Sequence, residues 1–345
     1  LVLFLFSGPG NRVFHPWWVV RRVRWVKGRI LLTGASGFVG QGLLAALDQA
    51  GHQVTACARQ LRPDSHYPLL AGPELGPYAD WRPLLAGQQV VIHCAGRVHV
   101  MREQAARPLE AFRRVNVQGS WRLARQAAAA GVQRFIFLSS IKVNGETSRP
   151  GQPWQACDRP VPADAYGQSK YEAERLLQRL AADTGMAVTV IRPVLVYGPG
   201  VKANFRRLLG WLARGWPLPL GAVDNRRSLL ALDNLADLVV RCCSHPAAAN
   251  QVFLASDGQD LSTPELLRLL GEGLGRPARL WPVPLPLLEG AARLLGREAW
   301  LERLCGSLQV DIRKTCSLLD WQPPVAAAEA LQATARAFLQ PGASR

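Results

Sequence analysis

The chain has 345 residues, of which 48% are hydrophobic and 19% are charged. This composition excludes a disordered protein and suffices for one large core, or for a core with a smaller lobe. The formal net charge is +16, but the arginines are spread along the sequence without a long basic run. We interpret the charge as compositional bias with affinity for an anionic small molecule, and we expect no nucleic-acid partner.

Residues 1–28 differ from the rest of the chain, with five basic residues, three tryptophans and no acidic residue. Their apolar run of six residues is too short for a signal peptide or a bilayer span, and we expect no integral membrane segment elsewhere. We therefore treat residues 1–27 as an N-terminal extension. It reflects either a start site assigned upstream of the working protein or a basic aromatic segment that lies on a membrane surface.

Seven cysteines, at positions 57, 94, 157, 242, 243, 305 and 316, show no Cys-x-x-Cys spacing. Most of them lie in apolar runs, which fits buried reduced thiols better than disulfides or a zinc site. We therefore expect a cytoplasmic protein with no metal site.

A glycine-rich turn follows the first apolar run after the extension. Residues 29–32 read RILL, residues 33–40 read TGASGFVG, and residues 41–51 have helical spacing and end in a glycine. The first glycine permits a tight turn, the second lets backbone amides approach a pyrophosphate, and the third allows close packing of the helix on the strand. The phosphates would lie at the positive end of the helix. The predicted cofactor contacts here are Gly34, Ser36, Gly37, Phe38, Val39 and Gly40.

Further apolar runs recur at the spacing of parallel strands, at 53–58, 89–96, 134–140 and 187–198. A helical stretch over 109–131 separates two of them. Continuously apolar strands that alternate with helices predict an α/β fold with a doubly wound, Rossmann-type parallel sheet, which we place at residues 28–198. Ligands of such sheets bind at the carboxyl ends of the strands.

Three side chains with matching chemistry belong to these strand ends. Ser140 ends one strand, and Tyr166 and Lys170 share one face of a helix predicted over 165–185. A tyrosine has a pKa of about 10, and a nearby ammonium favours its phenolate form. Tyr166 is then the acid and base, Lys170 lowers its pKa and binds the cofactor ribose, and Ser140 hydrogen-bonds the reacting carbonyl. The alternative for the Tyr-x-x-x-Lys spacing alone is an ordinary exposed helix pair.

Six motifs resemble, in this order, those of the extended short-chain dehydrogenase/reductase family, in its sugar-nucleotide epimerase/dehydratase branch. They read TGASGFVG, VIHCAG, NVQGS, FIFLSSIKVNG, YGQSK and IRPVLVYGPG, and the likeness covers residues 28–335. The resemblance implies that Asn116 supports the active-site helix and its water relay. It also implies cofactor contacts at Ala95, Gly96 and Pro193.

Residues 199–345 read mainly as a smaller mixed α/β lobe that binds substrate, because the strand rhythm weakens and helical stretches alternate with short apolar runs. The resemblance implies substrate contacts at Ser139, Asn144, Asn204 and Arg227, although the family often has a tyrosine at position 144. The guanidinium of Arg227 would bind a diphosphate. The alternative for Arg227 is a surface arginine beside a strand.

The stretch VTACARQ, residues 54–60, bears on the choice of cofactor. An acidic residue that binds the ribose of NAD usually falls about 20 residues after the last glycine of the turn, but this window holds Ala58 and Arg59. Asp64 follows only later. Arg59, helped by Arg62, could pair with the 2′-phosphate of NADP(H), which we therefore favour over NAD(H). The alternative for Arg59 is a solvated loop charge.

These features predict an NADPH-consuming C4 ketoreductase of a UDP-4-keto-6-deoxy-hexose type substrate, as the resemblance allows in surface-polysaccharide synthesis. The alternative is a UDP-sugar 4-epimerase with tightly held NAD, acting on UDP-glucose or UDP-GlcNAc through the same three side chains. A catalytically silent dinucleotide-sensing protein is a third hypothesis, against which the intact Ser140, Tyr166 and Lys170 argue. The resemblance also implies a homodimer that pairs through helices near 105–130 and 165–182.

Overall fold

The computed structural model describes residues 28–61, 67–98, 107–149, 151–296 and 298–340. The predictions for the N-terminal extension, for Arg62 and for Asp64 lie outside these ranges. Within them, no helix is both long enough and apolar enough to cross a bilayer. The described residues also contain no group of three or more His, Cys, Asp or Glu side chains gathered as for a metal ion.

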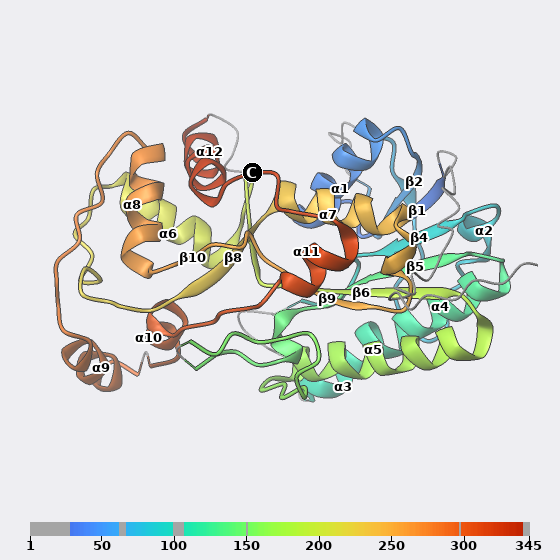
Figure 1. Cartoon of the computed structure of the whole chain (residues 1–345), viewed down its shortest axis with the longest axis horizontal. Helices are drawn as coiled ribbons and strands as arrows, with labels where there is room; N and C mark the ends of the chain where they lie inside the picture. The colour runs from blue at the N-terminus through green and yellow to red at the C-terminus, as the bar shows by residue number, and fades with distance from the viewer. Residues whose placement is uncertain (1–27, 62–66, 99–106, 150, 297, 341–345) are drawn as a thin grey trace, which may run out of the picture.

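Seven parallel strands form the larger sheet (Figure 1). In spatial order they are β3 (Leu70–Ala71), β2 (Gln53–Ala58), β1 (Arg29–Thr33), β4 (Val90–His93), β5 (Arg134–Leu138), β6 (Ala187–Pro193) and β9 (Val252–Ala255). The strand order reverses between β1 and β4, which is where sheets of this kind bind ligands. The predicted doubly wound α/β fold is confirmed.

Helices cover both faces of this sheet (Figure 1). One face carries α1 (Phe38–Gln49), α7 (Leu232–Ser244) and α11 (Arg313–Leu319), and the other carries α2 (Arg82–Leu85), α3 (Pro108–Phe112), α4 (Ser120–Ala129) and α5 (Ala165–Thr184). Successive strand side chains point to opposite faces. Ile30 and Leu32 therefore join the core on the α1 side, whereas Leu31 joins the core on the α5 side.

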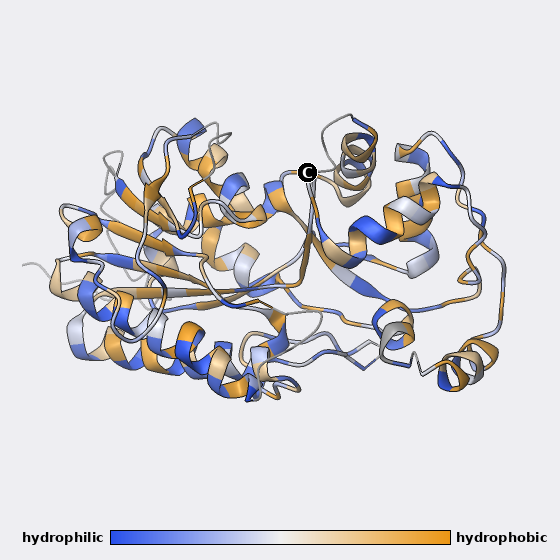
Figure 2. Ribbon diagram, turned by 180° about the vertical axis from the view of Figure 1, so that it is seen from behind, coloured by the Kyte–Doolittle hydropathy of each residue, from blue (hydrophilic) through white to orange (hydrophobic). Residues whose placement is uncertain are grey.

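A three-stranded sheet carries the smaller lobe. In it β10 (Asp260–Leu261) runs antiparallel to β8 (Arg227–Ala231), which runs parallel to β7 (Leu195–Tyr197). The core of this lobe lies among these strands and α6 (Ala203–Ala213), α8 (Thr263–Gly273) and α12 (Ala327–Leu339). Two further helices complete this lobe, α9 (Leu285–Leu294) at its outer corner and α10 (Glu298–Cys305), whose last residues pack against its core (Figure 1). The hydropathy colouring shows α9 as largely apolar (Figure 2).

The chain passes repeatedly between the two lobes. β7 leaves the end of β6 to join the small sheet, α7 returns to pack on α1, and β9 completes the large sheet before β10 enters the small one. Late in the chain, α11 packs beside β9 while α12 packs beside α8. Residue 198, the expected boundary, therefore lies just after a strand of the small sheet.

Three predicted helices differ in detail from the expectation. α1 begins at Phe38, three residues before the stretch 41–51 that the sequence indicates. The stretch 109–131 forms α3, a π-helical segment η1 (Arg113–Gly119) and α4. α5 matches the expected helix, since Asp164 caps its start and Gly185, at φ 75°, ends it. Short 3-10 turns lie at η2 (Ile141–Val143) and η3 (Pro246–Ala248).

The glycine turn between β1 and α1 depends on close backbone contact. Gly34 has φ 74°, a conformation that L side chains rarely adopt. A Cβ atom on Gly40 would lie 2.1 Å from the carbonyl oxygen of Gly34. The first turn of α1 can therefore sit against the end of β1 only because position 40 lacks a side chain.

We expect Gly40→Ala to lower the free energy of unfolding by about 1–3 kcal/mol, because the added methyl overpacks this contact. Gly290→Ala in α9 is the matched control, since a Cβ there meets no atom within 4 Å. That control should leave stability unchanged or raise it by up to about 1 kcal/mol. Urea denaturation measures both, and equal effects of the two substitutions would contradict the packing argument.

Candidate active site

The turn between β1 and α1 fits a dinucleotide phosphate. Gly37 caps α1 without a side chain, and its amide donates to the Gly34 carbonyl at 3.0 Å. A Cβ on Gly34 would lie 2.8 Å from the amide nitrogen of Ala95, so the turn packs directly on the loop after β4. The start of α1 thus presents backbone amides and the positive end of the helix dipole at the switch point of the sheet.

Ala58 and Arg59 lie beside this turn, as the sequence predicts from their spacing. The amide of Ala35 donates to the carbonyl of Cys57 at 3.1 Å, which ties the turn to the end of β2. Ala58 is buried, whereas Arg59 is exposed directly after the strand. An exposed guanidinium therefore stands where a ribose-binding carboxylate is usual.

The three predicted catalytic side chains come together at the carboxyl end of β5. Tyr166 and Lys170 project from the first turns of α5, and Ser140 lies between β5 and η2. Ser140 hydrogen-bonds the Tyr166 hydroxyl. Lys170 is buried, its Nζ donates to the Leu138 carbonyl at 2.8 Å, and it lies 4.5 Å from the centroid of the Phe137 ring. This grouping is what a carbonyl-reducing or alcohol-oxidising site requires.

The electrostatics differ from the expectation in one respect. Burial raises the pKa of Tyr166 to about 12, the charge of Asp164 adds to this rise, and the hydrogen bond from Ser140 opposes it. Burial also lowers the pKa of Lys170 to about 8. The net shift of the Tyr166 pKa is therefore upward in the free protein, opposite to the lowering expected from Lys170, and desolvation is its largest cause.

Asn116 joins the active-site helix to the loop after β4. Its Nδ2 donates to the Arg97 carbonyl at 2.9 Å and to Ser169 Oγ at 3.0 Å, while its Oδ1 accepts from the Arg97 amide at 2.8 Å. A Cβ on Gly96 would lie 3.0 Å from this Oδ1 and 3.7 Å from Lys170 Nζ. Asn116 lies in the π-helical segment, a local irregularity that is frequent at functional sites.

Ser139 and Asn144 occupy different positions from those that substrate contacts need. Asn144 is fully buried, its Nδ2 donates to the Gln155 carbonyl at 3.1 Å, and its Oδ1 accepts from Arg192 at 2.9 Å. Ser139 is 4% exposed, and its hydroxyl donates to Glu174. Their predicted substrate contacts gain no support from this geometry, because both side chains are turned inward and engaged by protein groups.

The remaining predicted residues belong to other elements of the fold. Pro193 ends β6 and is half-buried. Arg227 begins β8, and its guanidinium donates to the Gly306 carbonyl at 2.8 Å. The neighbouring Arg226 lies 3.2 Å from Glu265 instead. Asn204 is exposed in the first turn of α6. Arg227 thus belongs to the smaller lobe and is half-buried, and burial lowers the pKa of its guanidinium.

Sequence reasoning missed the pair that fixes the start of α5. Asp164 Oδ1 accepts from the Gly167 amide at 2.7 Å, and its Oδ2 lies 2.6 Å from Lys142 Nζ. A Cβ on Gly167 would lie 2.6 Å from the Lys142 carbonyl oxygen, so α5 closely approaches the segment that follows Ser140. The signal was available, because an aspartate directly before a predicted helix is a typical N-cap.

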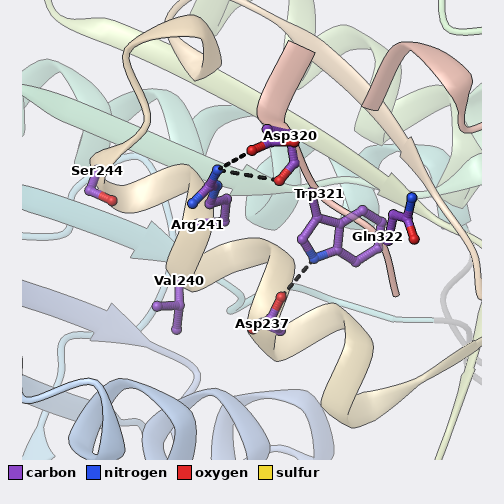
Figure 3. Close-up of a pocket in the computed structure, with 7 residues that line it drawn as sticks. All are labelled: Asp237, Val240, Arg241, Ser244, Asp320, Trp321 and Gln322. Atoms are coloured by element: carbon purple, nitrogen blue, oxygen red, sulfur yellow. Dashed lines mark hydrogen bonds and ion pairs between the residues drawn. The ribbon is translucent and has the colours of Figure 1, made fainter. Parts of the chain in front are cut away.

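A surface hollow elsewhere contains none of these residues (Figure 3). It lies between α7 and the residues after α11, where Trp321 Nε1 donates to Asp237 at 2.7 Å and Arg241 lies 3.8 Å from Asp320. These contacts fasten α11 and its following turn to α7. The chemistry at the end of β5 gives the better candidate site, because it gathers acid–base groups beside the glycine turn.

The lowered pKa of Lys170 predicts a pH effect on cofactor binding. A lysine loses its positive charge above its pKa, so NAD(P) affinity should fall by up to about tenfold as the pH rises from about 7 to about 9.5. Lys170→Met should bind more weakly at neutral pH and show no such step. Fluorescence titration of the dinucleotide measures both, with Lys314→Met as the control. A flat wild-type profile would contradict the proposed ribose contact.

Comparison with known proteins gives one consistent result. Residues 30–255 match the model of the NAD dependent epimerase/dehydratase family. A UDP-glucose 4-epimerase of Vibrio cholerae is 45% identical over 313 residues, which cover 90% of this chain and 95% of that protein. A GDP-6-deoxy-D-mannose reductase of Pseudomonas aeruginosa is 30% identical over 315 residues, which cover 88% of this chain and 95% of that protein.

Among solved structures, MoeE5 in complex with UDP-glucuronic acid and NAD superimposes with a TM-score of 0.72 at 25% identity. The match covers 90% of this chain and 98% of that one. These findings confirm the resemblance that the six motifs indicate and identify the chain as an enzyme rather than a silent sensor. The chain belongs to the NAD dependent epimerase/dehydratase family.

Proposed function

We propose that this enzyme is a UDP-hexose 4-epimerase, which was the alternative in the sequence analysis. The observation that carries the proposal is the 45% identity to a UDP-glucose 4-epimerase across 90% of this chain. That match supports the epimerase better than the ketoreductase, which the sequence features alone favour. The arrangement of Ser140, Tyr166 and Lys170 suits both, because each reaction moves a proton at an oxygen on C4.

The proposed chemistry uses each side chain at one atom. Tyr166 takes the proton of the C4 hydroxyl and later returns it to the C4 oxygen. Ser140 hydrogen-bonds both the Tyr166 oxygen and the substrate oxygen, and the Ser140 bond favours the phenolate form of Tyr166. Bound NAD supplies the acceptor and donor of hydride. Lys170 holds a positive charge beside the site and binds the cofactor ribose.

We propose that Gly34, Gly37 and the start of α1 hold the pyrophosphate of the dinucleotide, because Gly37 caps α1 without a side chain and leaves backbone amides at the positive end of the helix. On the substrate side, Arg227 is proposed to bind the diphosphate of the sugar nucleotide. One N–H of its guanidinium donates to the Gly306 carbonyl, and the other N–H groups could donate to phosphate oxygens. Asn204, exposed on α6, remains a weaker candidate for the nucleoside end.

A second candidate function is the NADPH-consuming C4 ketoreductase. One observation favours it: the exposed Arg59, beside the buried Ala58, replaces the carboxylate that would repel a 2′-phosphate. An epimerase has no need to discriminate in favour of NADPH, since the cofactor ends each cycle in its starting state. A reductase consumes it in every turnover.

Product analysis separates the two functions. The purified protein is supplied with UDP-glucose, UDP-GlcNAc or a UDP-4-keto-6-deoxy sugar, each with and without NADPH. We expect UDP-galactose or UDP-GalNAc to form without net cofactor oxidation. Stoichiometric loss of NADPH absorbance with the keto sugar, and no epimer from the other two substrates, would instead establish the reductase.

We expect Tyr166→Phe to lower kcat by about 10²–10⁴-fold, because it removes the acid–base hydroxyl. Dinucleotide affinity should change little, since the ring and its packing remain. Tyr171→Phe on the same helix is the control and should keep wild-type turnover. Steady-state kinetics and a binding titration measure the two effects, and a Tyr166→Phe enzyme with normal kcat would disprove the assigned role.

A further inference from the structure

A buried ionic network lies beneath the proposed catalytic side chains. Arg192 of β6 and Glu174 of α5 form an ion pair in which Arg192 Nη2 lies 2.6 Å from Glu174 Oε2 and Nε lies 3.0 Å from Oε1. Their side chains are 4% and 2% exposed. The Ser139 hydroxyl donates to Glu174, and Arg192 Nη1 donates to Asn144 Oδ1 at 2.9 Å.

Three members of this network, Glu174, Ser139 and Asn144, are close in the chain to a reacting group. Glu174 lies one helical turn after Lys170 on α5, so both side chains are on the same face of the helix. Ser139 directly precedes Ser140, and Asn144 directly follows η2, which begins after Ser140. The network therefore joins α5, β6 and both sides of the segment that carries Ser140.

We propose that Glu174 is a positioning residue, which holds Ser140 and Lys170 at the separation that the reaction needs by binding Ser139 and Arg192 together. This inference rests on the proposed catalytic roles of Ser140, Tyr166 and Lys170. Glu174 touches neither reacting group, and it acts through the end of β5 and through its own helix.

Stability alone does not account for the network. Removing two charges from water costs free energy that their attraction barely restores, and well-packed apolar residues at such positions are often as stable or more stable. What an ion pair with fixed hydrogen bonds adds is a defined geometry. A displacement of about 1 Å at a reacting group can lower a rate by about 10²-fold. Placement of Ser140 and Lys170 is the property that this network is suited to control.

Glu174 also acts on Lys170 through its charge. Burial lowers the pKa of Lys170 to about 8, and the negative charges of a Cys94 thiolate and of the Glu174 carboxylate, in that order, oppose this shift. Of the other groups near Lys170, His93 of β4 has its pKa lowered to about 3, and Cys94 and Tyr166 have theirs raised to about 12. These three are uncharged between about pH 6 and 10. Removing the charge of Glu174 should therefore lower the pKa of Lys170 further.

The test compares Glu174→Gln with Glu172→Gln, on the same helix. Glu172 pairs with Arg113 at 2.6 Å at the surface, and its loss should change kcat by less than about twofold. Glu174→Gln should lower kcat by about 10- to 100-fold, with KM for the sugar nucleotide within about threefold of wild type. The pH midpoint at which NAD(P) affinity is lost should also fall by about 0.5–1 unit.

Ser139→Ala is the second variant, and it leaves no buried charge unpaired because Glu174 keeps Arg192. It should lower kcat without moving the pH midpoint of NAD(P) binding. A rise in KM with unchanged kcat would instead identify Ser139 as a substrate contact. This variant keeps the proposal testable if Glu174→Gln folds poorly.

The proposal is overturned if Glu174→Gln or Ser139→Ala matches the Glu172→Gln control in kcat, or if Glu174→Gln matches it in the pH midpoint. Failure of the proposed function has a different signature. In that case the wild-type enzyme turns over none of the UDP sugars, whereas the pH midpoint of NAD(P) binding still reports on the coupling between Glu174 and Lys170.

Discussion

The hydrogen bond from Lys170 Nζ to the main-chain carbonyl of Leu138 is the contact on which the site depends. It joins the helix that carries Tyr166 to the strand that leads to Ser140. A buried ammonium is costly unless its donors are satisfied, so the bond fixes where α5 can lie along the sheet. Three further contacts then hold the same helix against other segments. They are the Asp164–Lys142 ion pair, the Asn116–Ser169 hydrogen bond and the Glu174–Arg192 ion pair.

The glycine turn after β1 also helps to place the proposed cofactor site beside the acid–base groups. Gly34 lets β1 and the loop after β4 approach within backbone contact, and Gly96 leaves room between that loop and the Lys170 ammonium. A side chain at Gly34 or Gly96 would crowd the place where these loops meet, and the Lys170 ammonium beside them is hydrogen-bonded to the Leu138 carbonyl. The proposed cofactor and acid–base groups are adjacent for this reason.

The parts of the site that the sequence predicts are those with local signals. The glycine spacing, the Tyr-x-x-x-Lys spacing and the serine after a strand each follow from periodicity within a few residues. Substrate contacts at Ser139 and Asn144 are expected from the resemblance alone, and no local pattern indicates their partners Glu174 and Arg192, which are far away in the sequence. The pKa of Tyr166 was also beyond prediction, since it depends on burial in the folded chain. The fold itself was predictable because continuously apolar strands alternate with helices over most of its length.

The repeated passage of the chain between the lobes has a mechanical consequence. Many two-lobed enzymes close by rotation about one or two flexible linkers. Here β6–β7, β8–α7, β9–β10 and α11–α12 all connect the large sheet layer to the smaller lobe, and a rotation would have to bend all of these connections together. We therefore expect little rotation between the lobes, so that the proposed acid–base group Tyr166 and the proposed diphosphate contact Arg227 keep a nearly fixed separation.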